Sequence, residues 1–451
     1  MARPTPLSGF PELLPAERIA EQHVLDHLRA TFELHGFASV ETRAVEPMEQ
    51  LLRKGEIDKE VYVLRRLQAE DSEGDARLGL HFDLTVPFAR YVLEKAGHLD
   101  FPFRRYQIQK VWRGERPQEG RFREFTQADI DVVARDVLPF HFDVEIASVM
   151  AEALAGLPLP PVRLQLSNRK LLEGFYRGLG AEDPTAVMRV MDKLDKLDET
   201  GIRTLLAECG LDEQQAGLCL ALAEVVTEDT AFVDRVRALG VTDPMLDEGL
   251  ADLAEVVGSL TDLGLDGVTV TADLRIARGL DYYTGTVFET MLEGYESLGS
   301  ICSGGRYEAL ASDGRNVFPG VGISLGVTRM VVPLVARGAL TASRSVPSVV
   351  LVAVSDEASR PRSNAIARAL RGRGIACEVA PSAAKFGKQI RHADRRGIPY
   401  VWFPAAADPT GDAGDEVKDI RSGEQVVADA ATWTPPTADL RPQVVTKETA
   451  Q

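Results

Sequence analysis

Apolar residues recur at helical spacing near the start of the chain. Between residues 15 and 34 they fall on one helical face, and Gly36 stands where such a helix would end. These apolar positions are Ile19, Val24, Leu25, Leu28 and Phe32. The pattern predicts one amphipathic helix. His23 and His27 lie four residues apart on it, but no third ligand accompanies them, so we predict no metal site.

Residues 101–133 predict a strand, a polar loop and a returning strand. Aromatic and β-branched residues are concentrated on both sides of residues 114–120, a polar segment with two glycines and a proline. Alternation along the returning strand places four side chains on one face: Phe125, Gln127, Asp129 and Asp131. An aromatic ring, an amide and two carboxylates in one row are unusual for a core and suit a pocket for a polar ligand.

Helical spacing dominates from about residue 163 to residue 265. The apolar stripe between Thr185 and Thr200 is one example, and it predicts a single helix there. Strand character returns at 268–274 and again at Val287 and Phe288. We therefore expect a helical insertion, residues 163–265, between two strand-rich halves of a first domain spanning residues 1–335.

The composition changes after Met330. Small and polar residues at 336–347 suggest an exposed linker, and a second domain is expected at 348–432. Its predicted elements alternate as strand 349–352, helix 364–371, strand 377–379, helix 386–396 and strand 400–403. Such alternation predicts a small, mostly parallel α/β domain. The Pro- and Thr-rich tail at 433–451 lacks periodicity, and we expect it to be disordered.

Composition and charge narrow the class of protein. The 451 residues carry a net charge of −17, which argues against indiscriminate adhesion to nucleic acid. No apolar run approaches a membrane-spanning length, and the four cysteines are widely spaced, which predicts a cytoplasmic protein with free thiols and no membrane partner. Two basic patches contrast with the acidic background: seven Arg and Lys against two Glu at 104–123, and ten against two acids at 358–400.

Two segments offer chemistry. The hairpin loop places Arg113, Arg121 and Arg123 near Glu115, and planar guanidinium groups suit phosphate and carboxylate oxygens, although a surface arginine more often only forms ion pairs. The run from Gly320 to Arg329 contains GxGxxxG, which is not the dinucleotide fingerprint. We interpret these glycines as a strand that passes close to a ligand and delivers Arg329 at the following helix.

Two further segments are ambiguous when taken alone. Asp83 and Thr85 lie near a predicted strand end, where a turn or a helix cap would explain them equally well. The tandem tyrosines Tyr282 and Tyr283 follow Arg278 and Gly279, and tandem tyrosines usually pack in a core.

Together these segments resemble the histidyl-tRNA synthetase family of class II aminoacyl-tRNA synthetases over nearly the whole chain. The run 113–125, RGERPQEGRFREF, is similar to the second signature motif of the class, and 322–329, GISLGVTR, is similar to the third. The run 278–283, RGLDYY, and the run 83–85, DLT, resemble stretches peculiar to the histidine enzymes.

The resemblance implies an α+β fold: an antiparallel catalytic sheet with helices and a helical insertion near the tRNA acceptor arm, followed by a C-terminal α/β anticodon-binding domain. It also implies a homodimer. The implied activity is that of a histidine–tRNA ligase, which activates L-histidine with ATP and Mg²⁺ to histidyl-adenylate and transfers the histidyl group to tRNA(His).

The resemblance also implies roles for individual residues. Arg113 and Arg278 take the catalytic positions at the α-phosphate, and Arg113 also meets the amino-acid carboxylate. The remaining ATP-binding residues are Glu115 and Phe125 at the adenine and Arg121 and Arg329 at the γ-phosphate. The remaining histidine-binding residues are Asp83, Thr85, Gln127, Asp131, Tyr282 and Tyr283.

One position departs from the family pattern, and one rival function resembles the same motifs. The first class motif has a proline at the end of a strand, where this chain has Ala44. The rival is a catalytically inactive, synthetase-like regulatory subunit of ATP phosphoribosyltransferase, which lacks the tRNA domain. Arg278 with Gly279 and the basic domain after residue 348 favour the synthetase.

Overall fold

The computed structural model describes residues 5–52, 60–67, 77–194, 196–277, 282–312, 314–405 and 414–446. The chain divides into two compact units. The first comprises Met1–Pro11 and Val24–Pro333, and the second comprises Glu12–His23 and Leu334–Gln451. The N-terminal helix is formed as predicted, α1 (Pro15–Leu34).

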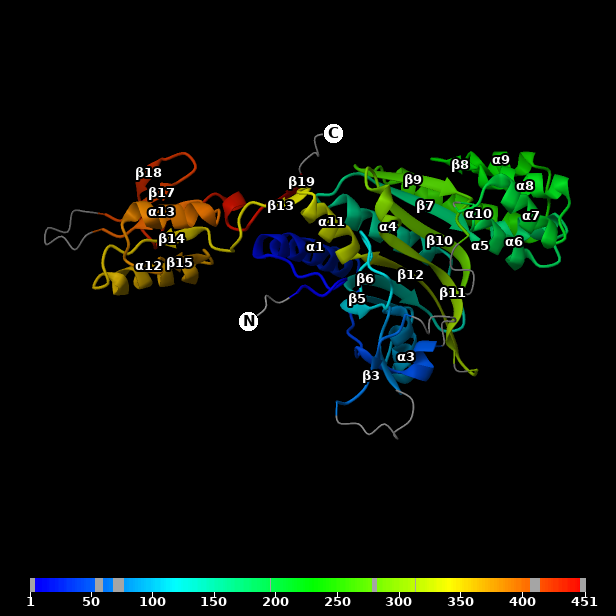
Figure 1. Ribbon diagram of the computed structural model, residues 1–451, viewed down its shortest axis with the longest axis horizontal. Helices are drawn as coiled ribbons and strands as arrows, with labels where there is room; N and C mark the ends of the chain where they lie inside the picture. The colour runs from blue at the N-terminus through cyan, green and yellow to red at the C-terminus, as the bar shows by residue number, and fades with distance from the viewer. Residues whose placement is uncertain are drawn as a thin grey trace. The chain divides into compact units, whose positions relative to one another are not determined.

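The first unit is built on a nine-stranded sheet with the order β1-β5-β6-β12-β11-β10-β7-β9-β8 (Figure 1). Neighbouring strands are antiparallel except for β1 with β5 and β7 with β9. The strands are β1 (Ala38–Ser39), β5 (Phe103–Trp112), β6 (Glu124–Val133), β7 (Val162–Asn168), β8 (Val226–Thr227), β9 (Val268–Asp273), β10 (Tyr283–Leu292), β11 (Cys302–Ser312) and β12 (Val317–Gly326). This confirms the expected antiparallel sheet.

The strand register places a row of polar side chains on one face of the sheet. Asp129 of β6 lies opposite Ser324 of β12, which lies opposite Ser303 of β11, which in turn lies opposite Glu289 of β10. Residues that are directly opposite in an antiparallel pair point to the same face. Four adjacent strands therefore supply one continuous polar surface.

The opposite face of the sheet is covered by α4 (His141–Ala155), which contacts β6, β9 and β12. Arg306 of β11 points to this side, where its Nη2 lies 2.7 Å from Oδ2 of the fully buried Asp143. A buried arginine needs such a partner because an uncompensated charge there is costly. Helix packing on this side leaves the polar row on the other face.

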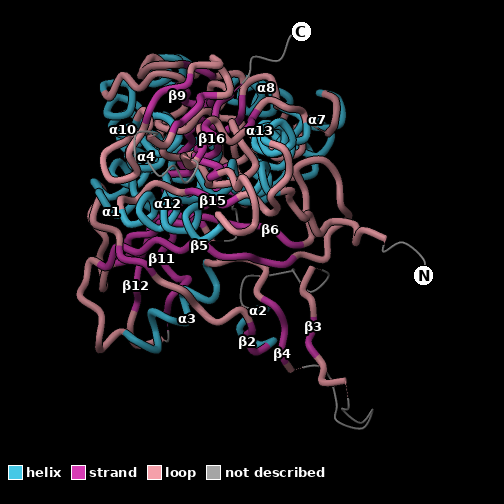
Figure 2. The backbone as a smooth tube through the Cα atoms, turned by 90° about the vertical axis from the view of Figure 1, so that its left-hand side faces the viewer, coloured by secondary structure: helices cyan, strands magenta, loops and turns pink. Residues whose placement is uncertain are grey.

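A small sheet and α3 (Thr85–Lys95) lie at the end of the polar face. The small sheet has the order β2-β4-β3, with β2 (Val45–Pro47), β3 (Val63–Leu64) and β4 (Leu78–Leu80), and α2 (Met48–Leu51) follows β2. In Figure 2 this small sheet projects beyond α3 at the lower edge of the molecule. Phe88 and Val92 of α3 pack against Tyr307 and Phe318, which anchors the helix to the main sheet.

A helical segment lies between β7 and β9, as expected from the periodicity. Its helices are α5 (Arg169–Gly178), α6 (Pro184–Met191), α7 (Glu199–Glu208), α8 (Glu213–Ala223), α9 (Phe232–Ala238) and α10 (Pro244–Asp262) (Figure 1). The single helix predicted over 185–200 is wrong. Helix α6 ends at Met191, and α7 starts after Asp198, whose side chain accepts a hydrogen bond from the backbone N–H of Gly201.

The second unit contains a five-stranded sheet with the order β15-β14-β16-β17-β18. The strands β14 (Val350–Val352), β15 (Cys377–Val379) and β16 (Tyr400–Phe403) are parallel, whereas β17 (Glu416–Asp419) and β18 (Gln425–Val427) continue antiparallel from β16. Helix α12 (Arg360–Gly372) packs on the side of Val350 and Trp402, and α13 (Phe386–Arg395) packs on the side of Leu351 and Val401. The α/β prediction is confirmed, although its parallel part is only three strands.

Two expectations about this unit are wrong. Part of the predicted linker forms β13 (Leu340–Ala342), and the predicted disordered tail contains η3 (Thr437–Asp439) and β19 (Val444–Thr446). Strands β13 and β19 pair antiparallel, and Leu340 is buried. The tail is therefore ordered at least to residue 446, because its backbone hydrogen bonds are made to a strand about 100 residues earlier.

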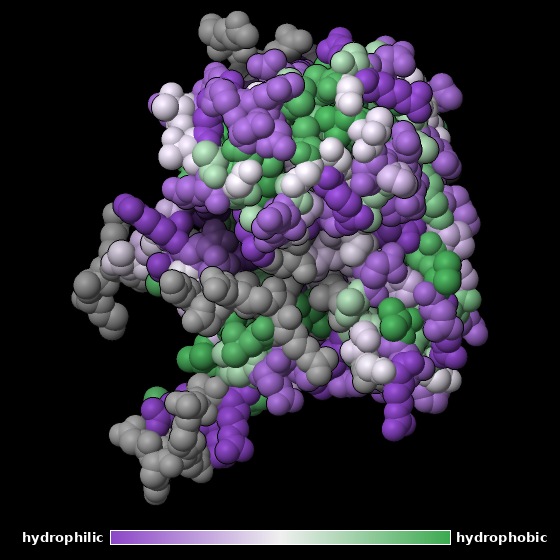
Figure 3. All heavy atoms as spheres, turned by 90° about the vertical axis from the view of Figure 1, so that its right-hand side faces the viewer, coloured by the Kyte–Doolittle hydropathy of each residue, from purple (hydrophilic) through white to green (hydrophobic). Residues whose placement is uncertain are grey.

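Three further features of the fold are the lengths of its helices, the polarity of its surface and the state of its cysteines. No helix within the described parts of the chain combines the length and apolarity needed to cross a bilayer. Hydrophilic residues predominate on the face seen in Figure 3, with smaller hydrophobic patches between them. The four cysteines are free thiols, and all but Cys209 are buried.

Candidate active site

The β5–β6 hairpin carries the first group of site residues. Trp112 and Glu124 form the last pair of its ladder, and the backbone N–H of Arg113 donates to the carbonyl of Arg123 at 2.9 Å. Within the loop, Gln118 and Arg121 form a bridge, and Gly120 has φ of 72°, a conformation that glycine adopts without strain. The loop is thus a defined turn that presents Arg113 and Arg121 on one side.

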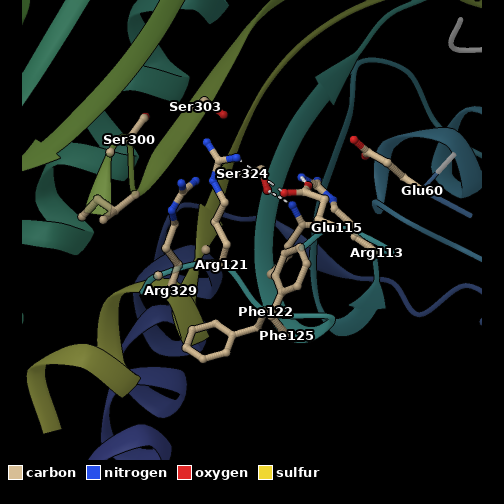
Figure 4. Close-up of a pocket in the computed structure, with 15 residues that line it drawn as sticks. Glu60, Arg113, Glu115, Arg121, Phe122, Phe125, Ser300, Ser303, Ser324 and Arg329 are labelled. Atoms are coloured by element: carbon tan, nitrogen blue, oxygen red, sulfur yellow. Dashed lines mark hydrogen bonds and ion pairs between the residues drawn. The ribbon is translucent and has the colours of Figure 1, made fainter. Parts of the chain in front are cut away.

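A cavity of about 360 Å³ lies beside this hairpin. Its walls include all five residues expected at ATP, namely Arg113, Glu115, Arg121, Phe125 and Arg329. In Figure 4 the side chains of Arg121 and Arg329 extend next to each other, with their guanidinium groups at the same end. Three arginines from two separate chain segments therefore converge on one polar cavity.

The guanidinium groups are oriented by the surrounding protein. The Nε of Arg113 donates to the carbonyl of Phe82 at 3.0 Å, and its Cζ lies 5.1 Å from the ring centre of Phe125. Glu115 lies 3.6 Å from Arg113 and 3.8 Å from Arg121. These contacts hold the cations in place before any ligand arrives, which suits groups that stabilise developing negative charge.

Arg329 reaches the cavity from the start of α11 (Val327–Ala336), directly after β12. Its Nε donates to the carbonyl of Leu298 at 3.0 Å. The interpretation of the glycine-rich segment as a strand that delivers Arg329 at a following helix is confirmed.

The glycines of β12 also make room for protein side chains, while Gly326 lines the cavity. A Cβ added to Gly322 would lie 2.2 Å from the Oδ1 of Asp131, and one added to Gly320 would lie 2.5 Å from the hydroxyl of Tyr307. These distances are too short for any other residue at positions 320 and 322 unless the neighbours move.

A second, smaller pocket of about 30 Å³ adjoins the large cavity, because Ser303 and Ser324 line both. It contains four of the residues expected at histidine, namely Thr85, Asp131, Tyr282 and Tyr283. Burial raises the pKa of Tyr283 well above its usual value, and the neighbouring Tyr282 adds to the effect. The Tyr283 phenol is therefore neutral and able to donate a hydrogen bond.

The carboxylates of this pocket share one buried cation. Asp131 lies 2.7 Å from Nη2 of the fully buried Arg105 and accepts a hydrogen bond from the Tyr307 hydroxyl at 2.9 Å. The guanidinium of Arg105 also lies 4.2 Å from the ring centre of Phe88. Asp129 is 4.0 Å from the same arginine. The pocket is thus acidic at its surface, with its compensating cation beneath.

Burial raises the pKa of Asp129 from 3.8 to about 7; Asp131 adds to the rise, while Arg105 and the Ser324 hydroxyl oppose it. Between these pH values the folded chain keeps a proton that the unfolded chain has released. Asp129 therefore contributes stability that is fully present below about pH 4 and lost as the pH rises through about 7.

This linkage gives a testable stability profile. Asp129→Asn removes the titration, so the free energy of unfolding of the variant relative to the original chain should rise by roughly 2 to 3 kcal/mol between pH 5 and pH 8. Denaturant unfolding at both pH values measures the difference. A difference that does not change with pH would show that Asp129 titrates near its ordinary pKa.

Three predicted site residues remain to be located: Gln127, Asp83 and Arg278. Gln127 lines the large cavity. Asp83 lies two residues before α3, and its Oδ1 accepts a hydrogen bond from the backbone N–H of Val86 in the first turn at 3.0 Å. Arg278 lies outside the described residues. The sequence analysis missed Arg105, Tyr307 and Ser324 as site residues, since only the strand register brings them to the pocket.

Comparison with known families shows to which family the chain belongs. A family model described as histidyl-tRNA synthetase matches residues 9–330. The chain belongs to the histidyl-tRNA synthetase family. A second model, described as an anticodon binding domain, matches residues 348–404, within the second compact unit. The family membership agrees with the resemblance found in the signature motifs.

Similar members of the histidyl-tRNA synthetase family span the whole chain. The histidine–tRNA ligase of Cutibacterium acnes is 61% identical over 453 residues, covering 99% of this chain and 99% of that protein. That of Micrococcus luteus is 60% identical over 457 residues, covering 98% of this chain and 99% of that protein. The crystal structure of histidyl-tRNA synthetase from Nostoc sp. PCC 7120 matches with a TM-score of 0.84 at 33% identity, covering 95% of this chain and 98% of that chain.

Proposed function

We propose that this chain is a histidine–tRNA ligase that condenses L-histidine with ATP to histidyl-adenylate and then esterifies tRNA(His). The observation that carries the proposal is the pair of adjoining pockets. A cavity with three converging arginines opens beside a small pocket with tyrosine side chains and carboxylates, and two serines line both. This arrangement brings a triphosphate and an amino acid to one place.

The first step joins two anions. The carboxylate oxygen of histidine attacks the α-phosphorus of ATP, the bond from that phosphorus to the bridging oxygen breaks, and pyrophosphate leaves. The carboxylate is already ionised, so no general base is required. Fixed cations lower the barrier by stabilising charge on the equatorial oxygens. We assign Arg113 and Arg278 to the α-phosphate and Arg121 and Arg329 to the γ-phosphate.

The second step transfers the histidyl group. A hydroxyl of the terminal ribose of tRNA attacks the carbonyl carbon of the adenylate, and AMP leaves with the electron pair of the broken bond. The adenine is assigned to Glu115 and Phe125, both of which line the large cavity. The site must hold the adenylate between the two steps, since the carboxyl group that attacks the phosphorus in the first step is the group that the ribose attacks in the second.

Selection of histidine needs polar partners for its ring and its ammonium group. We assign Tyr282 and Tyr283 to the imidazole, and Asp83, Thr85, Gln127 and Asp131 to the ammonium group and its surroundings. Buried polar groups left without partners penalise amino acids that lack the ring nitrogens. The raised pKa of Tyr283 keeps its phenol protonated for this role.

Mg²⁺ enters the proposal as part of the ATP substrate. Among the residues that the structure describes, no three His, Cys, Asp or Glu side chains come together in a way that could hold a metal ion. We therefore place the ion on the phosphate oxygens of the nucleotide, where it neutralises charge, and assign no protein residue to it.

The second unit is proposed to bind the anticodon arm of tRNA(His). On α13, Lys388, Arg391 and Arg395 are exposed, and their spacing places them on one helical face. Other arginines of the basic patch are engaged within the unit, such as Arg360 with Glu357 and Arg362 with Asp415. The α13 face is thus the stronger candidate for phosphate contacts.

Replacing Lys388, Arg391 and Arg395 together with alanine should raise the KM for tRNA by tenfold or more and flatten its salt dependence, since each lost phosphate contact removes about one released counterion. Histidine-dependent pyrophosphate exchange should be unchanged. Aminoacylation kinetics at several salt concentrations measure the effect, with Arg360→Ala as the control. Equal loss of exchange and charging would instead assign α13 a structural role.

We also propose a homodimer, as the family resemblance implies, and a cytoplasmic location, as the sequence composition predicts. Ala44, at the position of the first-motif proline, directly precedes β2, and its carbonyl accepts a hydrogen bond from the backbone N–H of His81 at 2.9 Å.

The regulatory-subunit alternative is less well supported, because the related ligases span the full chain and an anticodon-binding model matches its second unit.

A direct test of the full proposal is the charging of tRNA. The purified chain with ATP, Mg²⁺ and radiolabelled histidine should form acid-precipitable histidyl-tRNA on a tRNA(His) transcript and not on a transcript for another amino acid. Exchange activity without any charging would restrict the function to adenylate formation.

A further inference from the structure

A chain of hydrogen bonds connects three polar residues at the junction of the two pockets. The Nε2 of Gln127 donates to Oγ of Ser324 at 2.9 Å, and that hydroxyl donates to Oδ1 of Asp129 at 2.5 Å. Gln127 and Asp129 lie two residues apart on β6, and Ser324 lies opposite Asp129 on β12. Strand register therefore brings the three side chains together on the polar face.

The chemistry of the three groups determines which group donates and which accepts in each hydrogen bond. Above about pH 7 Asp129 is ionised and only accepts hydrogen bonds, so under those conditions the single proton of the Ser324 hydroxyl is committed to Asp129. The serine oxygen then has only lone pairs left for Gln127, and it must receive the amide N–H₂ group. The two ends of a carboxamide are nearly equal in shape, so this hydrogen bond is what distinguishes them.

The consequence is a free acceptor at the site. Among the described residues, the Oε1 of Gln127 is buried without a hydrogen-bond partner, and Gln127 as a whole is only 7% exposed. A buried acceptor without a partner is costly unless a ligand completes it. A carbonyl oxygen suits the α-ammonium of an amino acid, whereas an amide N–H₂ in its place would oppose a cation.

We infer that Asp129 is a positioning residue: acting through Ser324, it holds the Gln127 carboxamide with its oxygen toward the ammonium group of the amino-acid substrate. The inference rests on the proposed function, since it concerns binding of the substrate to Gln127. It adds a residue outside the predicted histidine-binding set, and it assigns Asp129 no direct contact with the substrate.

Asp129 also lines the small pocket, so direct binding of the substrate by its charge is the competing explanation. The two explanations differ at Ser324. If Asp129 acts through the serine, removal of the hydroxyl has the same consequence as removal of the carboxylate, and removal of both adds nothing. If Asp129 binds the ammonium group itself, Ser324→Ala leaves binding nearly intact and the two changes act independently.

The test is a double-mutant cycle of Asp129→Ala, which leaves no acceptor for the serine proton, and Ser324→Ala, measured by pyrophosphate exchange at pH 8, with thermal unfolding to verify that each variant folds. We expect each single variant to raise the KM for histidine about 10- to 100-fold, the range for a charge-assisted hydrogen bond. The double variant should show no further increase, and the KM for ATP should stay within about twofold. Independent, multiplying effects, or a normal KM for histidine in Ser324→Ala, would overturn the inference.

Two inhibitors separate orientation of the amide from a general loss of the pocket. Histidinol carries the ammonium group, and imidazole-4-propionate lacks it. Inhibition by histidinol should weaken in both single variants, whereas inhibition by imidazole-4-propionate should be unchanged; equal weakening of both would contradict the role assigned to Gln127. If the unmodified chain shows no histidine-dependent exchange, the proposed function is wrong. If the unmodified chain is active and the variants show a normal KM for histidine, only the role assigned to Asp129 is wrong.

Discussion

Arg113→Ala is expected to lower the rate of histidine-dependent pyrophosphate exchange by about 100- to 1,000-fold, the usual cost of removing one preorganised donor from a developing negative charge. Arg113 is held by the Phe82 carbonyl and lies over Phe125, with its guanidinium at the large cavity. The loss should appear mainly in kcat, because the interaction strengthens as charge builds on the phosphate.

Two variants make this prediction specific. Arg113→Lys keeps the charge but loses the planar fork, so it should recover only part of the rate. Arg104→Ala removes an arginine of β5 that pairs with Glu145, at 2.7 Å, and does not line the cavity. Its exchange rate should stay within about threefold of the original. A similar loss in both alanine variants would show that Arg113 acts through stability rather than through the phosphate.

Arg278→Ala is expected to abolish adenylate formation while leaving histidine binding in place. Arg278 lies outside the described residues, and its role is inferred from the RGLDYY run and from the need for cations at the α-phosphate. The expected fall in kcat is about 1,000-fold, the cost of removing a preorganised cation from a developing negative charge.

The measurement for Arg278 combines single-turnover adenylation with equilibrium binding of histidine. Binding by calorimetry should change by less than about tenfold, because we assign the imidazole contacts to Tyr282 and Tyr283. Near-normal turnover would exclude the catalytic role. Loss of histidine binding together with turnover would move Arg278 from the phosphate to the amino acid.

Local patterns predicted much of this fold. The β5–β6 hairpin was recognisable because two runs of aromatic and β-branched residues flank a polar loop with Gly114 and Gly120. The alternation of strands and helices in the second unit was equally local. The break between α6 and α7 was not recognised, because the apolar stripe continues through Leu194 and Leu197, beyond the end of α6 at Met191. Asp198, which caps the start of α7, lies inside the single helix that was predicted.

Long-range pairing could not be read from the sequence. Strand β19 looks like a disordered tail because its partner, β13, is about 100 residues away and itself resembles a linker. In the candidate site, too, local patterns predicted some residues, and long-range pairing brings in others. Gln127 and Asp131 were expected from alternation on one strand, whereas Ser324 and Tyr307 reach the pocket only through the pairing of β12 with β6 and β11.

Pyrophosphate exchange measured with each of the twenty amino acids shows which amino acid this chain activates. We expect rapid, ATP-dependent exchange with L-histidine and little with any other amino acid, because only histidine satisfies the polar groups of the small pocket beside the arginine-lined cavity. Exchange with a different amino acid, or none with any amino acid by a folded preparation, would contradict this expectation.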